Sequence, residues 1–281
     1  MTITSYREYK DFMSEYRKCA LARLHPVMRG HAKDYYKIES TLAREKLPLD
    51  QTLAFESALL HNFKANIIDS KIGSCELNLP DPADINYYNW HCLIQMRHLE
   101  LPTRLIDWSM GDETPLFFGT NSHHGDDGHM WLYTSSMINY ENISDPDLKE
   151  ILQEKYQHIN AGERAQEYLH SVDPLNPEKL SLVHFPYKGR MGNKVAEKRR
   201  AIQGGKFMVP PNDLISIPIE ETFLRPLMTQ IKIDGDSKAK ILGEMQAVYN
   251  INDERVLSPI PADTQEILQE IEQKSREEVG I

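Results

Sequence analysis

Cysteine is scarce in this chain, and its scarcity excludes two common ways of stabilising a fold. The 281 residues include only Cys19, Cys75 and Cys92, and no two of them have CxxC spacing. Such a set does not support a disulfide framework or a structural zinc site. The sequence also lacks an apolar N-terminal segment and any run of about 18 apolar residues, so we expect neither a secretory signal nor a membrane span. A cytoplasmic location is the resulting expectation.

Positive charge is also in short supply. The chain has 32 basic and 42 acidic residues, which gives a net charge of -10. This balance argues against a broad surface for nucleic-acid phosphates, although it allows a local basic cleft. Three catalytic signatures are missing as well: there is no GxSxG elbow, no GxGxxG turn, and Lys206 is followed by Phe207, which excludes a P-loop. The usual hydrolase, kinase and dehydrogenase classes therefore have no support.

The patterns that are present predict both helices and strands. The spacing of apolar residues predicts helices over 5–23, 50–68 (with Asp50 as N-cap), 87–99, 238–249 and 264–273, and partial helix over 145–180. Short apolar runs predict strands over 27–30, 129–133, 207–209, 214–219 and 230–233, and a further apolar run covers 115–120. No repeat or linker interrupts these elements. We therefore predict an α+β fold in a single domain, 1–281, with small mixed or split β-sheets flanked by helices.

The first candidate site segment runs from Met28 to His31. Arg29 and Gly30 stand together at the end of a predicted strand. A planar guanidinium can bind a phosphate or carboxylate through two hydrogen bonds, and glycine lets the backbone approach a ligand closely. The alternative for Arg29 is a structural ion pair, which is common for arginine.

The second candidate segment, residues 97–109, concentrates polar groups beside apolar runs. It contains Arg97, His98, Thr103, Arg104 and Asp107. The last two are close enough in sequence to pair, and such a pair orients a ligand or simply locks a turn. His98 has an ordinary pKa of about 6.5 and can act as an acid, a base or a donor, or else as a helix cap or core group.

Two further segments have clear alternatives. After Arg199 and Arg200, Gly204 and Gly205 offer backbone N–H groups to a phosphate, or end a helix. The tract 121–129 holds three histidines and two aspartates. Because adjacent histidines do not share a face and no HExxH spacing occurs, we predict a turn and no metal.

Taken in order, these segments resemble the FRG-domain family, named for an aromatic-Arg-Gly motif. Met28 stands in the aromatic place before Arg29 and Gly30. The family's His-Tyr-Gly-Leu-Pro-Thr-Arg-Leu-Leu-Asp-Trp-Thr stretch is matched at 98–109, and its late Arg-x-x-x-Gln-x-Gly-x-Phe at 199–207. The departures are Met28, and Arg97, Leu99 and Glu100 around His98. The loss of the family's glycine at Glu100 is expected to reshape the turn that leads to Thr103.

The order of these motifs is similar to that of ADP-ribosyltransferases, and the resemblance implies a site. It assigns catalytic roles to Arg29, His98 and Gln203, and ligand-binding roles to Gly30, Thr103, Arg104, Asp107 and Gly205. Asp107 would fix Arg104, and Gln203 would steady a ribosyl cation, although an amide cannot serve as a base.

The implied ligand is a small nucleotide. NAD is the candidate substrate, no cofactor is assigned, and a protein or nucleic acid is the candidate acceptor. The resemblance also suggests a toxin or phage-defence effector. The alternative function is a non-catalytic module that binds or senses a nucleotide or nucleic acid.

Overall fold

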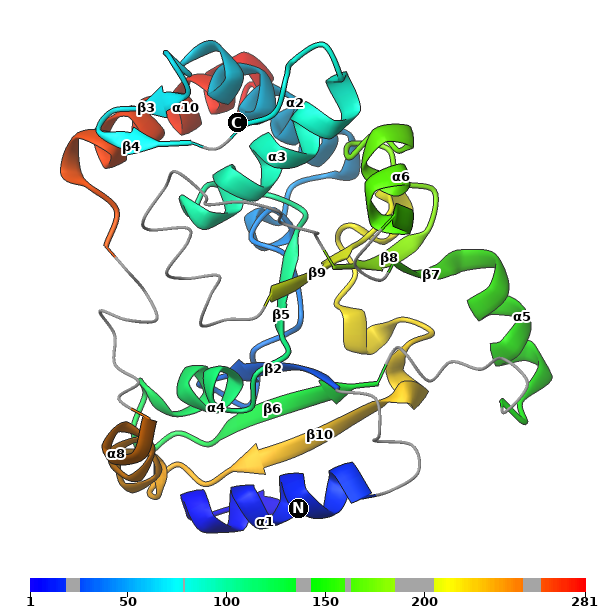
Figure 1. Cartoon of the computed structure of the whole chain (residues 1–281), viewed down its shortest axis with the longest axis vertical. Helices are drawn as coiled ribbons and strands as arrows, with labels where there is room; N and C mark the ends of the chain where they lie inside the picture. Colours follow the sequence, from blue (N-terminus) through cyan, green and yellow to red (C-terminus); the bar gives the residue numbers. More distant parts are fainter. Residues whose placement is uncertain (19–25, 78, 135–142, 160–162, 185–204, 250–258) are drawn as a thin grey trace.

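The fold is built around one large mixed β-sheet (Figure 1). The computed structural model describes residues 1–18, 26–77, 79–134, 143–159, 163–184, 205–249 and 259–281. The main sheet has eight strands in the order β1-β10-β6-β2-β5-β9-β8-β7, and a second sheet pairs β3 with β4. The strands are β1 (Thr2–Ile3), β2 (Val27–His31), β3 (Lys71–Ile72), β4 (Cys75–Glu76), β5 (Ile106–Ser109), β6 (Gly128–Tyr133), β7 (Tyr156–Ile159), β8 (Leu180–Val183), β9 (Gly205–Val209) and β10 (Met228–Ile233).

The main sheet consists of two halves that meet at a single residue pair. Strand β2 pairs with β6 over five residues and β5 pairs with β9 over four, whereas β2 and β5 share only the pair Met28–Ser109. In Figure 1, β2, β6 and β10 run together across the lower part of the molecule, while β5 rises steeply away from them. The predicted α+β class with a mixed, split sheet is confirmed.

Helices cover the two halves separately. The helices are α1 (Tyr6–Lys18), α2 (Leu49–Ala65), α3 (Ile85–His98), α4 (Glu113–Thr120), α5 (Pro146–Lys155), α6 (Glu163–Ser171), α8 (Lys238–Tyr249) and α10 (Ala262–Val279). One hydrophobic cluster lies among α2, α3, α6 and α10, and a second lies under α1, α4 and α8. A third covers the opposite face of the sheet, because Trp131 and Tyr133 of β6 point away from Met130 and Leu132.

Local capping explains where several helices begin. The Asp84 carboxylate accepts a hydrogen bond from the Tyr87 N–H at 3.2 Å, which fixes the start of α3. Helix α5 begins in the same way, with Asp145 as its N-cap and Pro146 in its first turn. Asp50 is not the N-cap of α2, as the sequence had suggested, because the helix already begins at Leu49 after Pro48.

One sequence prediction of local structure is wrong. The segment 214–219 forms no strand; it carries two 3-10 helices, Asn212–Leu214 and Ile219–Glu221, with Pro218 between them. The apolar run at 115–120 belongs to α4, which is buried on nearly all sides and therefore shows no amphipathic period. The predicted helix at 5–23 is seen over Tyr6–Lys18, and its remaining residues lie outside the described part of the chain.

Within the described ranges, the chain has neither a membrane-spanning helix nor a disulfide bond. No helix in them combines the length and the apolar character needed to cross a bilayer. Cys75 and Cys92 are buried thiols that form no disulfide, and Cys19 lies outside the described residues.

Candidate ligand-binding pocket between strands β2 and β5

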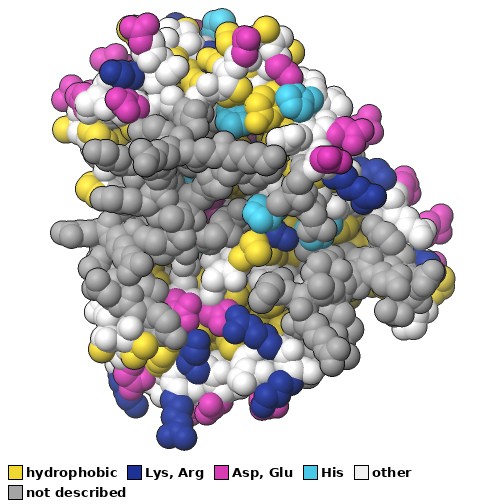
Figure 2. Space-filling model, in the orientation of Figure 1, with side chains coloured by type: hydrophobic (Ala, Val, Ile, Leu, Met, Phe, Trp, Pro, Cys, Tyr) yellow, Lys and Arg dark blue, Asp and Glu magenta, His cyan; other side chains and the backbone are white. Residues whose placement is uncertain are grey.

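A pocket of about 400 Å³ opens where the two halves of the sheet separate. Its walls come from β2, β5, the end of α3 and the start of α4. The lining residues are Met28, Arg29, Gly30, Thr41, Arg44, Arg97, His98, Glu100, Asp107, Trp108, Ser109, Thr114, Pro115 and Phe118. Three arginines thus face two carboxylates in one cavity of an acidic protein. Figure 2 shows acidic and basic side chains mixed over the visible surface, so the arginine content of the pocket is a local feature.

The pocket exists because β2 and β5 diverge immediately after their one shared pair. Beyond Met28–Ser109, the next antiparallel partners would be Arg29 and Trp108, but no ladder pair forms there. The side chain of Arg29 spans the opening instead, and its Nη1 donates to the Asp107 carbonyl oxygen at 2.7 Å.

Arg29 is the least neutralised charge in the pocket. Its Nε donates to His31 Nε2 at 3.0 Å and its Nη1 to the Asp107 carbonyl, both of them uncharged acceptors. A guanidinium has five N–H groups, and the other three make no hydrogen bond within the described part of the chain. No carboxylate among the described residues lies within 4.0 Å of it. Burial lowers the pKa of Arg29 to about 10, partly opposed by Asp107, so the group stays charged at neutral pH.

Arg97 and Asp107 form an ion pair across the pocket wall. Arg97 Nε and Nη2 donate to Asp107 Oδ2 at 2.7 and 2.5 Å. Burial alone would raise the pKa of Asp107, but the charges of Arg97 and Arg29 outweigh it and lower the pKa. Arg44 is held more loosely, with its Nε 3.8 Å from Glu39 Oε1. Burial and the charge of Arg97 lower the pKa of Arg44.

His98 and Glu100 enter the pocket from the end of α3. The Leu101 N–H donates to the Met96 carbonyl at 3.0 Å and the Glu100 N–H to the Arg97 carbonyl at 3.3 Å, which is the hydrogen-bond pattern of a Schellman motif. Glu100 has a φ of 69°, in the region that favours glycine. Glu100 thus holds this turn in a conformation that favours glycine, the residue that the family has at this place.

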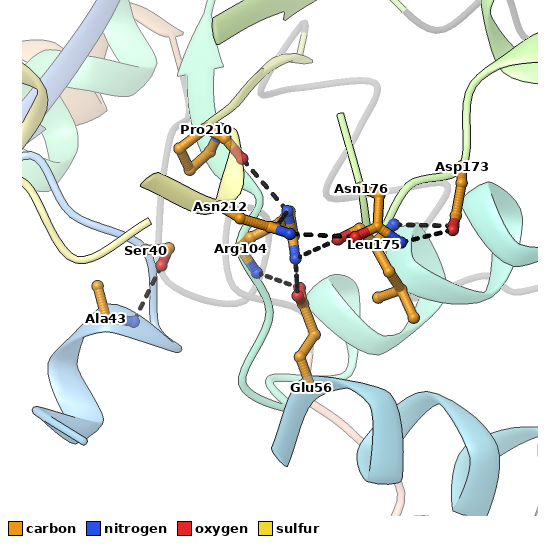
Figure 3. A network of polar contacts seen from close by, with 9 residues as sticks. All are labelled: Ser40, Ala43, Glu56, Arg104, Asp173, Leu175, Asn176, Pro210 and Asn212. Carbon is orange, nitrogen blue, oxygen red and sulfur yellow. Dashed lines mark hydrogen bonds and ion pairs between the residues drawn. The ribbon is translucent and has the colours of Figure 1, made fainter. Parts of the chain in front are cut away.

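Arg104 lies outside the pocket, in a buried network (Figure 3). Its side chain is 1% exposed, and its Nε and Nη2 donate to Glu56 Oε2 at 2.8 and 2.5 Å. Its remaining donors reach the Leu175 carbonyl, the Pro210 carbonyl and Asn212 Oδ1 at 2.9, 3.4 and 2.8 Å. The expected pair between Arg104 and Asp107 is not formed, because each side chain has another partner.

The glycine of the Arg-Gly motif serves helix packing as well as lining the pocket. A Cβ on Gly30 would lie 1.7 Å from the Pro115 carbonyl oxygen, so α4 packs directly on the β2 backbone. Gly128 makes a similar contact, since its Cβ would lie 2.7 Å from the Gly119 carbonyl oxygen. Only glycine allows so close an approach at these places.

The other residues that the sequence suggested for the site lie outside the pocket or outside the described part of the chain. Thr103 is fully buried behind the wall, where its N–H donates to Thr41 Oγ1 at 3.1 Å, and Thr41 itself lines the pocket. Gly205 pairs with Ser109 at the start of β9. Gln203, Arg199 and Arg200 lie outside the described residues. The structure therefore brings Arg29, Gly30, His98 and Asp107 to one pocket.

The histidine tract is divided between strand and loop. His123 and His124 are exposed, whereas His129 lies in β6 and contacts His31. Within the described ranges, no group of three His, Cys, Asp or Glu side chains is arranged to hold a metal ion.

Several pocket residues were not assigned to a site from sequence, although Arg97 had been noted. Arg44 lies 15 positions after Arg29 in a short 3-10 helix, Ala43–Glu45, and Thr41, Ser109 and Thr114 are hydroxyl residues of ordinary appearance. Among these three, only Ser109 could have been found from the sequence, because it is the last residue of the family motif matched at 98–109.

Comparison with known proteins agrees with the motif order. The family model described as FRG domain matches residues 25–128, which include β2, α3, β5 and α4 and thus every pocket wall. No curated protein and no solved structure matches the chain. Residues 25–128 are therefore an FRG domain.

Proposed function

We propose that the pocket binds a nucleotide through its phosphate groups. The observation that carries this proposal is Arg29: a half-buried guanidinium with two uncharged partners and no carboxylate partner among the described residues. An uncompensated charge in such a place is costly unless a ligand completes its contacts. Arginine matches the oxygens of a phosphate in geometry and charge.

The size and lining of the pocket suit such a ligand. A volume of about 400 Å³ falls within the range of roughly 300–1,000 Å³ that small-molecule sites occupy. Phe118, which is half-buried, offers apolar surface for a base or ribose, and the Ser109 and Thr114 hydroxyls line the same pocket. Arg44, held only loosely by Glu39, adds positive charge, so a pyrophosphate is a better match than a single carboxylate.

The catalytic form of the proposal is ADP-ribosyl transfer with NAD as the substrate. Arg29 would bind the pyrophosphate, and His98, which lines the same pocket, would donate a hydrogen bond or move a proton. The acceptor would be a protein or a nucleic acid. A toxin or phage-defence role would follow from this chemistry and remains a prediction.

One observation favours binding without turnover. Asp107 is ion-paired with Arg97 in the free protein, so this carboxylate is not poised as a base. A sensing module that binds a nucleotide needs no base. The two forms share the same ligand site and differ only in whether NAD is consumed.

Calorimetric titration with ADP-ribose and adenosine tests the shared site, because only ADP-ribose carries phosphate. We expect ADP-ribose to bind and adenosine to bind at least about tenfold more weakly, since a charge-assisted hydrogen bond contributes about 1.5–3 kcal/mol. Equal affinities would contradict the proposal. Incubation with NAD and chromatography of released nicotinamide then distinguishes the enzyme from the binding module.

A further inference from the structure

Arg29 stands at the end of a short chain of hydrogen bonds through two histidines. Arg29 and His31 are two positions apart on β2, so their side chains lie on the same face of the sheet. His31 is the register partner of His129 on β6. Arg29 Nε donates to His31 Nε2 at 3.0 Å, and His31 Nδ1 lies 2.9 Å from His129 Nε2.

The chemistry of arginine fixes the protonation of both rings. A guanidinium only donates, so His31 Nε2 must be unprotonated and the His31 proton must sit on Nδ1. His31 then donates to His129 Nε2, which is unprotonated in turn. The two rings are buried, with 6% and 1% exposure. Burial and the charge of Arg29 hold the pKa of His31 well below its usual range, and burial lowers that of His129, partly opposed by the backbone and charge of Asp34.

An imidazole is an unusual choice of acceptor among the arginines of this region. The Nε groups of Arg97 and Arg104 donate to carboxylates, Asp107 and Glu56, and these contacts cancel much of their charge. A carboxylate beside Arg29 would orient its side chain equally well. It would also neutralise the charge that an anionic ligand needs.

We propose that His31 and His129 are positioning residues that hold Arg29 through a neutral acceptor and so preserve its full charge for a phosphate-bearing ligand. This inference rests on the proposed nucleotide site, and it gives a reason why that site would select ligands that carry phosphate. The pocket would prefer ligands with a phosphate or pyrophosphate over neutral nucleosides because Arg29 is oriented without being neutralised.

Substitutions of His31 by Gln and by Glu form a matched pair, since the two side chains differ in charge and hardly in shape. Each offers an oxygen to Arg29 Nε, but only Glu neutralises it. We expect His31→Gln to bind ADP-ribose within about threefold of the wild type, and His31→Glu to bind at least about tenfold more weakly. His124→Gln, on the exposed loop, is the control. Equal affinity in the Gln and Glu variants would overturn the inference, whether both bind well or both bind poorly.

A second measurement uses the wild-type protein alone, without a ligand and without any substitution. Nitrogen-15 NMR of histidine-labelled wild-type protein reports which ring nitrogen carries the proton. We expect both His31 and His129 to be neutral with the proton on Nδ1. A proton on His31 Nε2 would refute the inference and leave the proposed function standing. Failure of the wild type to bind ADP-ribose, with the proton on His31 Nδ1, would refute the proposed function and with it the ligand part of the inference.

Discussion

Replacing Arg104 by lysine tests whether the arginine of the Leu-Pro-Thr-Arg motif belongs to the scaffold. Its guanidinium donates five hydrogen bonds, two to Glu56 and one each to Leu175, Pro210 and Asn212. A lysine amine concentrates three donors at one point and cannot reach acceptors on four residues from three separate segments. Each buried acceptor left unsatisfied costs about 1–3 kcal/mol. We therefore expect a loss of about 3–5 kcal/mol, the range for a broken buried ion pair.

Urea denaturation of the wild type and Arg104→Lys measures this loss. Arg7→Lys is the matched control, because the Arg7 side chain is 92% exposed and its ion pair with Asp11 spans 4.0 Å. The control should change stability by less than about 0.5 kcal/mol. The reasoning would be refuted if Arg104→Lys lost less than about 1 kcal/mol, or if it kept its stability and lost ADP-ribose binding.

Three further changes have expected outcomes. Glu100→Gly should raise the free energy of unfolding by about 1 kcal/mol in urea denaturation, because a φ of 69° strains every residue except glycine; a loss would contradict the strain. Gly30→Ala should lower the free energy of unfolding by about 1–3 kcal/mol, since the added Cβ would overlap the Pro115 carbonyl. An unchanged midpoint of urea denaturation would mean that α4 can move away from β2 without loss of stability. The pKa of Asp107 is lowered in the fold, so its stabilising effect is present above the ordinary value of about 3.9 and lost as the pH falls through the lowered pKa. The stability difference between wild type and Asp107→Asn should therefore be largest near neutral pH and shrink in acid, and a constant difference would contradict the ion pair.

The sequence predicted the elements whose patterns are local. Strands β2, β6 and β10 and helices α3, α8 and α10 follow from apolar spacing. Helix α4 was missed as a helix because a segment buried on nearly all sides loses its 3.6-residue period. The alternating apolar residues at 214–219 suggested a strand, and Pro218 prevented one.

The contacts within the site could not be predicted from closeness in sequence. Arg104 and Asp107 were expected to pair because they are three positions apart, yet Arg104 binds Glu56, 48 positions away, and Asp107 binds Arg97. The contact of His31 with His129 spans 98 positions and depends on strand register. Such pairings are set by the topology of the sheet, which a single sequence does not encode in any local pattern.

The central claim is that Arg29 binds the phosphate groups of a nucleotide. Calorimetric titration of wild type and Arg29→Lys with ADP-ribose, together with their melting temperatures, tests it most directly. Lysine keeps the charge and loses the planar fork, so we predict an affinity on the order of tenfold to a hundredfold lower, with a melting temperature that moves by only a few degrees. Unchanged affinity in Arg29→Lys, accompanied by a large fall in melting temperature, would show that Arg29 is part of the scaffold and would contradict the account.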